Sequence, residues 1–177
     1  MSILFIIAPE KFRDEELLHT QQVLENYGKN TVVASTKKGT CTGVLGAKIE
    51  STLNLSEVNV DEYDAIVFVG GQGTPIIRNS DEATRITKEA DQKGKIVAAI
   101  CWAPTILAKA GILKERKATV WVGNDAEYGK TTDKVLEDYG AKYVAKAVVV
   151  DGNIVTADGP GSARQFGEEI AKLLNSK

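Results

Sequence analysis

The stretch that decides the fold of this chain is residues 95–111, KIVAAICWAPTILAKAG, which contains Cys101. An apolar run without any charge precedes Cys101, and such a run is typical of a strand that is buried on both faces of a sheet. Pro104 suits the first turn of a helix, and Gly111 suits its C-terminal cap. The pattern therefore predicts a strand, a turn at Cys101 and then a helix.

Small residues flank the cysteine at this turn, since Ala99 and Ala103 lie two positions to either side of Cys101. This spacing is typical of a nucleophile elbow, because the tight turn has room only for small side chains and lifts the nucleophile clear of the sheet. The N-terminus of the following helix would favour a thiolate and supply backbone N–H groups. Free cysteines are also often buried and inert, so the pattern alone leaves a purely structural role open.

The length and composition are those of one soluble globular domain that spans residues 1–177. Hydrophobic residues make up 43% of the chain and charged residues 26%, and the net charge is −2. Such a nearly neutral balance gives no electrostatic reason to expect nucleic acid or an anionic membrane as a partner.

The first eight residues, MSILFIIA, are apolar, but they lack the basic region and cleavage site of a signal peptide and are too short to span a bilayer. We interpret them as the first strand and expect a cytoplasmic protein. The two cysteines, Cys41 and Cys101, do not suggest a disulfide framework, and a single histidine excludes a histidine-rich metal site. No standard glycine-rich phosphate loop is present, so neither a cofactor nor a metal is expected.

Strands and helices are predicted to alternate along the chain, which indicates a mainly parallel sheet with helices on both faces. Residues 40–55 mix glycine with β-branched residues and are expected to form an excursion such as a hairpin. In parallel sheets, ligands bind outside the carboxyl ends of the strands, where residues 9–16, Gly70-Gly71 and Cys101 are expected to converge. Strands are predicted at 2–8, 31–35, 65–69, 96–100, 118–122, 147–150 and 154–156, and helices at 14–27, 81–92, 104–110, 132–139 and after Ser162.

With these elements placed, the sequence resembles the ThiJ/PfpI superfamily, which includes the parkinsonism-associated protein deglycase. The resemblance covers nearly the whole chain and is strongest to the PfpI-type branch of intracellular proteases and stress proteins. It rests on the apolar first strand, Asp14-Glu15-Glu16-Leu17, Val69-Gly70-Gly71, Ala98-Ala99-Ile100-Cys101, residues 147–153 (AVVVDGN) and Asp158-Gly159-Pro160-Gly161.

The resemblance implies a flavodoxin-like three-layer sandwich that assembles as a homodimer or a larger homo-oligomer. It implies that Cys101 is the reactive cysteine, that Glu16 places a carboxyl group beside the sulfur, and that Gly71 and Trp102 supply backbone N–H groups. A carboxylate close to a thiolate would repel it, so Glu16 should have a raised pKa and stay protonated. On the residues alone, an ordinary acid in the first turn of a helix is the preferred interpretation of Glu16.

Three positions depart from the pattern of the superfamily. Trp102 stands where the PfpI branch usually has histidine, and Pro75 stands where that branch draws a glutamate from the neighbouring subunit. A cysteine protease needs a base for its thiol and an acid for its leaving amine, so peptide hydrolysis is not expected. Asp158 stands where some relatives use arginine to hold an anion, which argues against anion binding at that position.

His19 is the only histidine available to assist Cys101. It lies three residues after Glu16, on the same helical face, and could reach the pocket or the dimer seam beside it. The competing interpretation is a partly exposed helix histidine without a role in the site.

Two functions follow from this reading. The first is an enzyme in which Cys101 adds to an α-oxoaldehyde such as methylglyoxal, or to its early adducts on small molecules or protein side chains, while Glu16 moves protons. The second is an oxidative-stress sensor or chaperone-like protein in which Cys101 is oxidised to the sulfinate. Cys41 is expected to be a small packing residue in either case.

Overall fold

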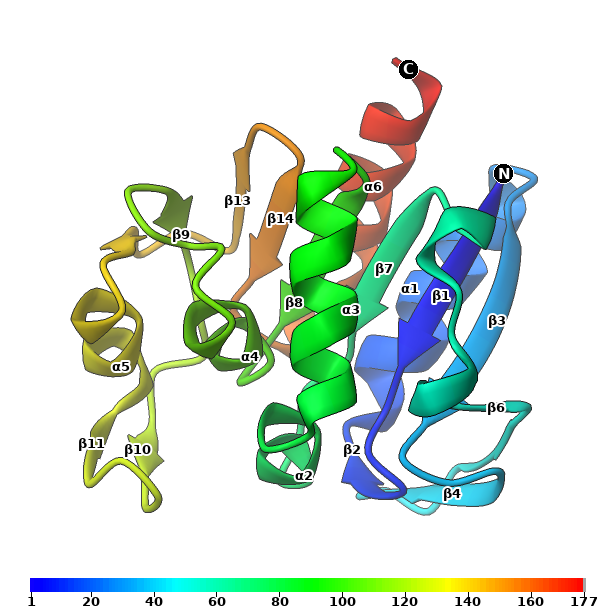
Figure 1. The fold of residues 1–177 in the computed structure, drawn as a ribbon, viewed down its shortest axis with the longest axis horizontal. Coiled ribbons are helices and arrows are strands. Elements are labelled where there is room, and N and C mark those ends of the chain that lie inside the picture. Colours follow the sequence, from blue (N-terminus) through cyan, green and yellow to red (C-terminus); the bar gives the residue numbers. More distant parts are fainter. Residues whose placement is uncertain (177) are drawn as a thin grey trace.

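The computed structural model describes residues 1–176 and contains a central sheet of seven strands in the order β13-β14-β8-β7-β1-β3-β6 (Figure 1). Neighbouring strands are parallel except for the antiparallel pair β13–β14. The bounds are β1 Ser2–Ile6, β3 Asn30–Ser35, β6 Leu53–Asn54, β7 Ala65–Phe68, β8 Ile96–Ile100, β13 Val148–Asp151 and β14 Ile154–Ala157.

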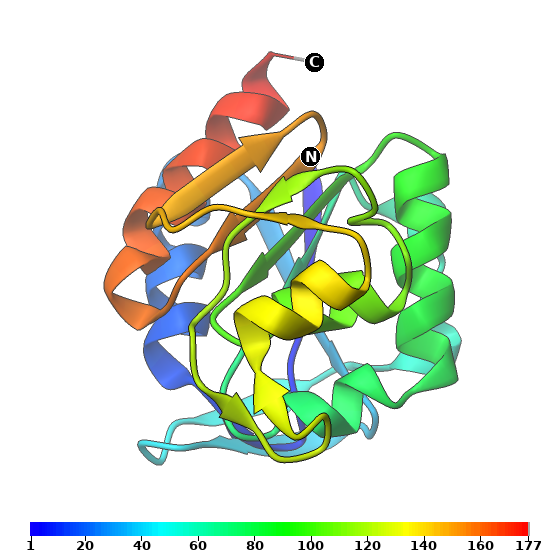
Figure 2. The same ribbon diagram turned by 90° about the vertical axis from the view of Figure 1, so that its left-hand side faces the viewer.

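Helices cover both faces of this sheet, as Figures 1 and 2 show. α1 (Asp14–Asn26) and α6 (Ala163–Asn175) lie on one face, and α3 (Asp81–Gln92) and α4 (Pro104–Lys109) lie on the other. The strands supply two cores because successive side chains point to opposite faces. In β1, Ile3 and Phe5 join the core under α1 and α6, whereas Leu4 and Ile6 join the core under α3 and α4. The predicted three-layer sandwich is confirmed.

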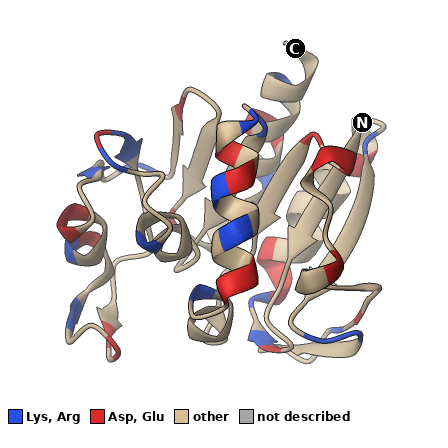
Figure 3. Cartoon of the chain, in the orientation of Figure 1, with Lys and Arg blue, Asp and Glu red and all other residues tan. Residues whose placement is uncertain are grey.

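Local sequence explains where the helices begin. α1 carries three acidic residues in its first turn, Asp14, Glu15 and Glu16, where the helix dipole favours negative charge. The Ser80 side chain caps α3 by accepting a hydrogen bond from the Ala83 N–H at 3.3 Å. Figure 3 shows charged residues of both signs along the outer side of α3, as expected for a helix that faces water.

A smaller sheet lies beside the carboxyl ends of the central strands. The predicted excursion at residues 40–55 contains an antiparallel hairpin of β4 (Gly39–Gly43) and β5 (Lys48–Ser51). β2 (Glu10–Phe12), which the sequence did not predict, pairs with β4 and completes a three-stranded sheet. Asp14 ties this hairpin to α1, since its two carboxylate oxygens accept from the Leu45 and Ala47 N–H groups at 2.8 and 2.7 Å.

The prediction of a strand over residues 118–122 was wrong. Only β9 (Lys117–Ala118) is a strand, and it pairs with β12 (Lys142–Tyr143) outside the central sheet. The backbone that follows makes other hydrogen bonds: Thr119 N–H donates to the Thr156 hydroxyl, and Trp121 N–H donates to the Cys101 carbonyl. The β-branched and aromatic pattern was therefore a poor guide here, because these N–H groups donate to a side-chain hydroxyl and to the turn at Cys101, and not to the backbone of a neighbouring strand.

The remaining elements are short and lie mostly near α4. α2 (Thr74–Arg78) follows Gly73 directly and was not predicted, and α5 (Thr132–Asp138) matches its prediction closely. β10 (Asn124–Asp125) and β11 (Lys130–Thr131) form a two-stranded ribbon. Three 3₁₀ turns occupy Leu55–Glu57, Val60–Glu62 and Pro160–Ser162. Within residues 1–176, no helix has both the length and the apolar character that crossing a bilayer requires.

Candidate active site

Four neighbouring strands end at the candidate site. β14, β8, β7 and β1 run side by side in the sheet and share their direction, so their carboxyl ends meet at one edge. Backbone hydrogen bonds join the segments that leave these strands: Arg13 N–H donates to the Gly70 carbonyl and Cys101 N–H donates to the Ala157 carbonyl, both at 2.9 Å. The predicted convergence of residues 9–16, Gly70-Gly71 and Cys101 is confirmed.

Cys101 occupies the turn between β8 and α4 with φ +63°, in the left-handed region that non-glycine residues rarely adopt. The turn is held at both ends, because Trp121 N–H donates to the Cys101 carbonyl at 2.8 Å and Ala103 N–H donates to the Ile100 carbonyl at 3.0 Å. The side chain is 9% exposed. Strained backbone of this kind persists where the surroundings over-determine it, and it is concentrated at functional sites.

Glu16 lies in the first turn of α1 and is completely buried. Its Oε2 atom accepts a hydrogen bond from the Gly70 N–H at 2.8 Å. No backbone or side-chain N–H among the described residues reaches its other oxygen, Oε1. Cys101 lies directly beside this carboxyl, since a Cβ at Gly70 would lie 2.7 Å from the Cys101 Cβ and 2.9 Å from Glu16 Oε2. Two acids from different elements therefore meet in one buried place.

The surroundings shift both acids toward their protonated forms. Burial raises the pKa of Glu16 from its ordinary value of 4.5 to about 7, and hydrogen bonds from Cys101 and the Gly70 N–H oppose the shift only in part. The pKa of the Cys101 thiol is raised by burial and then by the Glu16 charge, against the backbone N–H groups of Trp102 and Gly71. The expected rise for Glu16 is confirmed, whereas burial outweighs the expected stabilisation of a thiolate by the helix terminus.

These two groups titrate as a coupled pair, because each charge disfavours the other. When Glu16 is protonated, the repulsion that raises the Cys101 pKa is removed. The carboxylic acid can then donate a hydrogen bond to the sulfur. The pair can therefore hold one proton and one negative charge, and move the proton between carboxyl and thiol.

The double glycine allows the two acids to approach. A Cβ at Gly70 would lie 2.6 Å from the Ile100 carbonyl oxygen and 2.7 Å from the Cys101 Cβ, closer than such atoms come in proteins. Gly71 has φ +110°, and a Cβ there would lie 2.5 Å from the Lys11 carbonyl oxygen. The backbone N–H groups of Gly71 and Trp102 lie close enough to the Cys101 sulfur to lower the pKa of its thiol.

A cavity of about 230 Å³ opens in front of Cys101. Its walls are largely apolar, and they include one cation, Arg13, whose Nε donates to Glu15 at 2.8 Å. Sequence reasoning had named only three of the lining residues. The lining consists of Gly71, Cys101 and Trp102, which were predicted, and of Arg13, Val44, Gln72, Trp121 and Pro160, which were not.

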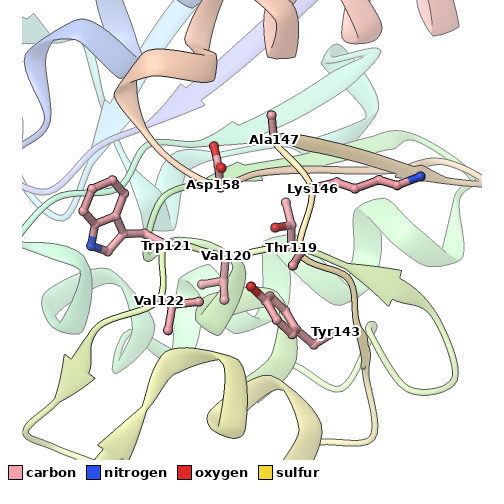
Figure 4. A pocket seen from close by; sticks show the side chains of 9 residues that line it. Thr119, Val120, Trp121, Val122, Tyr143, Lys146, Ala147 and Asp158 are labelled. Carbon is pink, nitrogen blue, oxygen red and sulfur yellow. The ribbon is translucent and has the colours of Figure 1, made fainter.

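Trp121 is the wall between this cavity and a second one of about 360 Å³, which Figure 4 shows. Its ring packs closely on the backbone that follows β14, since a Cβ at Gly159 would lie 2.7 Å from its Cε3 atom. Asp158 lines the second cavity and accepts a hydrogen bond from the Ser162 hydroxyl at 2.5 Å. Trp121 was not predicted as a site residue because residues 118–122 have the pattern of a strand.

The other residues considered from the sequence lie apart from the sulfur. His19 is half-buried on α1 and is absent from the described lining of the Cys101 cavity, so its role there stays a prediction. Pro75 lies in the first turn of α2. Cys41 is completely buried in the core under α1 and α6, as expected for a packing residue. Among residues 1–176, no three His, Cys, Asp or Glu side chains are grouped so as to hold a metal ion.

Comparison with known proteins finds a matching family and several relatives that align over most of the chain. The sequence model of the DJ-1/PfpI family matches residues 1–173. An uncharacterized protein of Methanocaldococcus jannaschii is 44% identical over 97% of this chain and 82% of its own length. The deglycase PfpI of Pyrococcus furiosus is 37% identical over 98% of this chain and 99% of its own length.

Two further proteins extend the comparison. A glutathione-independent glyoxalase of Caenorhabditis elegans is 28% identical, with coverage of 98% of this chain and 88% of its own. The crystal structure of a ThiJ/PfpI domain protein from Brachyspira murdochii superposes with a TM-score of 0.91 at 35% identity. That alignment covers 99% of this chain and 97% of the other.

Proposed function

The chain belongs to the DJ-1/PfpI family, and from that premise we propose that it is an enzyme that converts α-oxoaldehydes or their early adducts into 2-hydroxy acids through Cys101, without a cofactor. Relatives named deglycase and glyoxalase support this class of activity. The observation that carries the proposal is the close approach of Cys101 and the buried Glu16 carboxyl, whose pKa of about 7 suits proton transfer near neutral pH.

The first step is the addition of the Cys101 sulfur to the aldehyde carbon. A C–S bond forms, the carbonyl electron pair moves to the oxygen, and the thiol proton reaches that oxygen through Glu16. The Gly71 and Trp102 N–H groups beside the sulfur are placed to stabilise the oxygen while it is negative. With an adduct on an amine, the same C–S bond forms as the C–N bond breaks, and the amine leaves with a proton.

The second step moves a hydrogen from one carbon to the next. Glu16, now a carboxylate, removes the proton from the carbon bonded to sulfur, and an enediolate forms. The carboxylic acid returns that proton to the adjacent carbon while the hydroxyl proton of the first carbon passes to the oxygen of the second, which leaves a thioester of the 2-hydroxy acid. Water then cleaves the C–S bond, the sulfur regains its proton, and the sum is methylglyoxal plus water giving lactate.

The test is lactate release from methylglyoxal. Cys101→Ala should abolish it, and Glu16→Gln should lower kcat by about 10²–10⁴-fold, the range for loss of a general acid–base group. Cys41→Ala is the matched control, because Cys41 is also buried but does not line the cavity, and it should retain activity. Equal rates in the wild type and Cys101→Ala would remove Cys101 from the chemistry.

A second function is favoured by the N–H groups of Gly71 and Trp102 at the sulfur. They could equally hold the oxygens of a Cys101 sulfinate, the signal state of an oxidative-stress sensor. Dilute hydrogen peroxide would then add two oxygens to Cys101 while Cys41 stays reduced, which peptide mass spectrometry can measure. Equal oxidation of the two cysteines would contradict the sensor function.

Peptide cleavage is not proposed for this site. Trp102 follows the cysteine, and its buried indole Nε1 is a hydrogen-bond donor that cannot act as a base. The expected homodimer or larger homo-oligomer stays a prediction, which sedimentation of the purified chain would test.

A further inference from the structure

Arg13 is fixed against the reactive pair by its backbone. It directly precedes α1, and its N–H donates to the carbonyl of Gly70, whose own N–H binds the Glu16 carboxyl. Its side chain lines the same cavity as Cys101. The guanidinium charge lies close enough to lower the pKa of Glu16 and to interact with the Cys101 thiolate. Arg13 is thus held beside the reacting groups although it belongs to a loop.

The guanidinium has hydrogen-bonding capacity to spare. Its Nε and Nη2 atoms donate to the two carboxylate oxygens of Glu15 at 2.8 and 3.1 Å. The third nitrogen, Nη1, has no acceptor among the described residues. The side chain is 34% exposed, so the Glu15 pair neutralises it only partly in contact with water. One edge of the cation remains open to a ligand.

The other residues of the cavity restrict which ligands can reach the Arg13 cation. Val44, Trp102, Trp121 and Pro160 form apolar walls, and Arg13 is the only permanently charged side chain in the described lining. A volume of about 230 Å³ equals about eight water-sized groups at about 30 Å³ each, which limits the ligand to a small molecule. An apolar chamber with one cation favours a compact substrate that carries one anionic group.

We infer that Arg13 is a specificity-determining residue that binds a carboxylate of the substrate, so that the preferred substrates are short α-oxoaldehydes bearing a carboxylate. This inference rests on the proposed function of Cys101. A suitable probe is 4,5-dioxopentanoate, whose aldehyde carbon reacts at Cys101 while its carboxylate pairs with Arg13. Its conversion takes up one water and gives 2-hydroxyglutarate, by the same steps that turn methylglyoxal into lactate.

Sequence reasoning argued against an anion at position 158, and the structure places the cation on another element. Asp158 lines the second cavity, whereas Arg13 reaches the Cys101 cavity from the loop after β2. The charge near the sulfur therefore comes from the N-terminal side of the site.

The experiment measures the ratio of kcat/KM for 4,5-dioxopentanoate to kcat/KM for methylglyoxal. The wild type should favour the anionic substrate, and Arg13→Gln should lower the ratio about tenfold, chiefly through KM, as expected for one charge-assisted contact. Glu15→Gln should raise the ratio, because it frees the guanidinium. Arg164→Gln is the matched control, since Arg164 is an exposed arginine on α6 bound to Gln22, and it should leave the ratio unchanged.

An unchanged ratio in Arg13→Gln, with methylglyoxal still converted, would overturn the inference and spare the proposed function. If neither the wild type nor any variant converts either substrate, the proposed function fails, and the role of Arg13 is then tested by measuring ligand binding. Calorimetry of 2-hydroxyglutarate with Cys101→Ser and with Cys101→Ser/Arg13→Gln should then show about tenfold weaker binding in the second protein. Equal affinities would overturn the role of Arg13.

Discussion

Arg78 and Glu16 are both buried charge-bearing residues, and their surroundings handle the charge in opposite ways. Arg78 is 2% exposed, and its Nη1 donates to Asp125 Oδ2 at 2.6 Å and to the Thr105 hydroxyl at 3.0 Å. Its Nη2 donates to Glu127 at 2.8 Å. Glu16 is as deeply buried, yet it meets a second acid, Cys101, and a single backbone N–H.

The difference shows that burial alone does not decide whether a group is structural or reactive. Around Arg78, opposite charges stabilise each other, and the hydrogen bond with Arg78 lowers the pKa of Glu127. Around Glu16, the partly exposed Arg13 offsets burial only in part, so the carboxyl takes a proton whose release falls near neutral pH. Arg78 joins α2 to the β10–β11 ribbon and to α4, whereas Glu16 can exchange a proton with its neighbour.

The largest effect should come from removing Arg78, whose buried charge is compensated by Asp125 and Glu127. Arg78→Met leaves Asp125, which is 6% exposed, without its counter-charge and should lower the free energy of unfolding by about 3–5 kcal/mol. Urea denaturation measures this. Lys93→Met is the control, because the Lys93 ion pairs with Asp61 and Glu89 are exposed and should contribute little.

A double variant sharpens this result. Arg78→Met/Asp125→Leu removes both charges and should recover part of the stability, since a buried pair can often be replaced by apolar residues at little cost. If Arg78→Met alone loses less than about 1 kcal/mol, the ion pair is not what holds the ribbon to α2.

The next effect concerns the Glu16–Cys101 pair and appears as a dependence of the free energy of unfolding on pH. An acid whose folded pKa is raised stabilises the fold fully below its unfolded pKa, and this contribution is lost as pH rises through the folded pKa. For Glu16 the window runs from 4.5 to about 7, which corresponds to about 3 kcal/mol. Glu16→Gln cannot ionise, so its free energy of unfolding should lack this loss.

Denaturation curves of the wild type and Glu16→Gln at several pH values from 4 to 8 provide the measurement. The difference in stability between the two proteins should change steeply inside the window and stay level above it. A constant difference at all pH values would mean that Glu16 ionises at its ordinary pKa despite its burial.

A third, smaller effect tests whether the contact between the acids needs the double glycine. Gly70→Ala puts a Cβ against the Ile100 carbonyl and the Cys101 Cβ, which are rigid neighbours, and should cost about 1–3 kcal/mol of stability. It should also lower the activity, because the carboxyl and the thiol are pushed apart. Gly161→Ala is the control, since no atom lies within 4 Å of a Cβ there. Equal stability of the two variants would contradict the close approach.

The same contrast separates what sequence could predict from what it could not. The strand and helix around Cys101 are local patterns, an apolar run followed by Pro104, and the structure keeps both. Glu16 and Gly71 were located through the register of a superfamily, because an acid in a helix and a glycine after a strand carry no distinctive signal of their own.

Arg78 and Trp121 escaped prediction for a physical reason. In sequence, Arg78 looks like any surface cation, and its partner Asp125 lies 47 residues away on a ribbon too short to predict. Trp121 sits in a run that reads as a strand, but its backbone binds the Cys101 carbonyl. Both roles arise when loops close on the sheet, and only the folded structure shows them.

The smallest effect concerns the influence of two neighbouring charges, Arg13 and Glu15, on the pKa of Glu16. Arg13 lowers the pKa of Glu16 through its charge, and Glu15 raises it. Arg13→Gln should therefore move the Glu16 titration to higher pH, and Glu15→Gln should move it to lower pH. Each shift should be a fraction of a pH unit, because both side chains are partly exposed and water screens them. NMR titration of the labelled Glu16 carboxyl carbon in a Cys101→Ser background measures both shifts.

The double variant and salt decide whether these shifts are electrostatic. Arg13→Gln/Glu15→Gln removes one charge of each sign, so its Glu16 titration should lie between those of the single variants. Raising the salt from 0.01 M to 1 M shortens the screening length from about 30 Å to about 3 Å and should shrink both single shifts. Shifts of the same sign in both single variants, or shifts that persist in 1 M salt, would mean that the substitutions rearrange the first turn of α1. The proton of Glu16 would then depend on packing alone, and the neighbouring charges would not tune it.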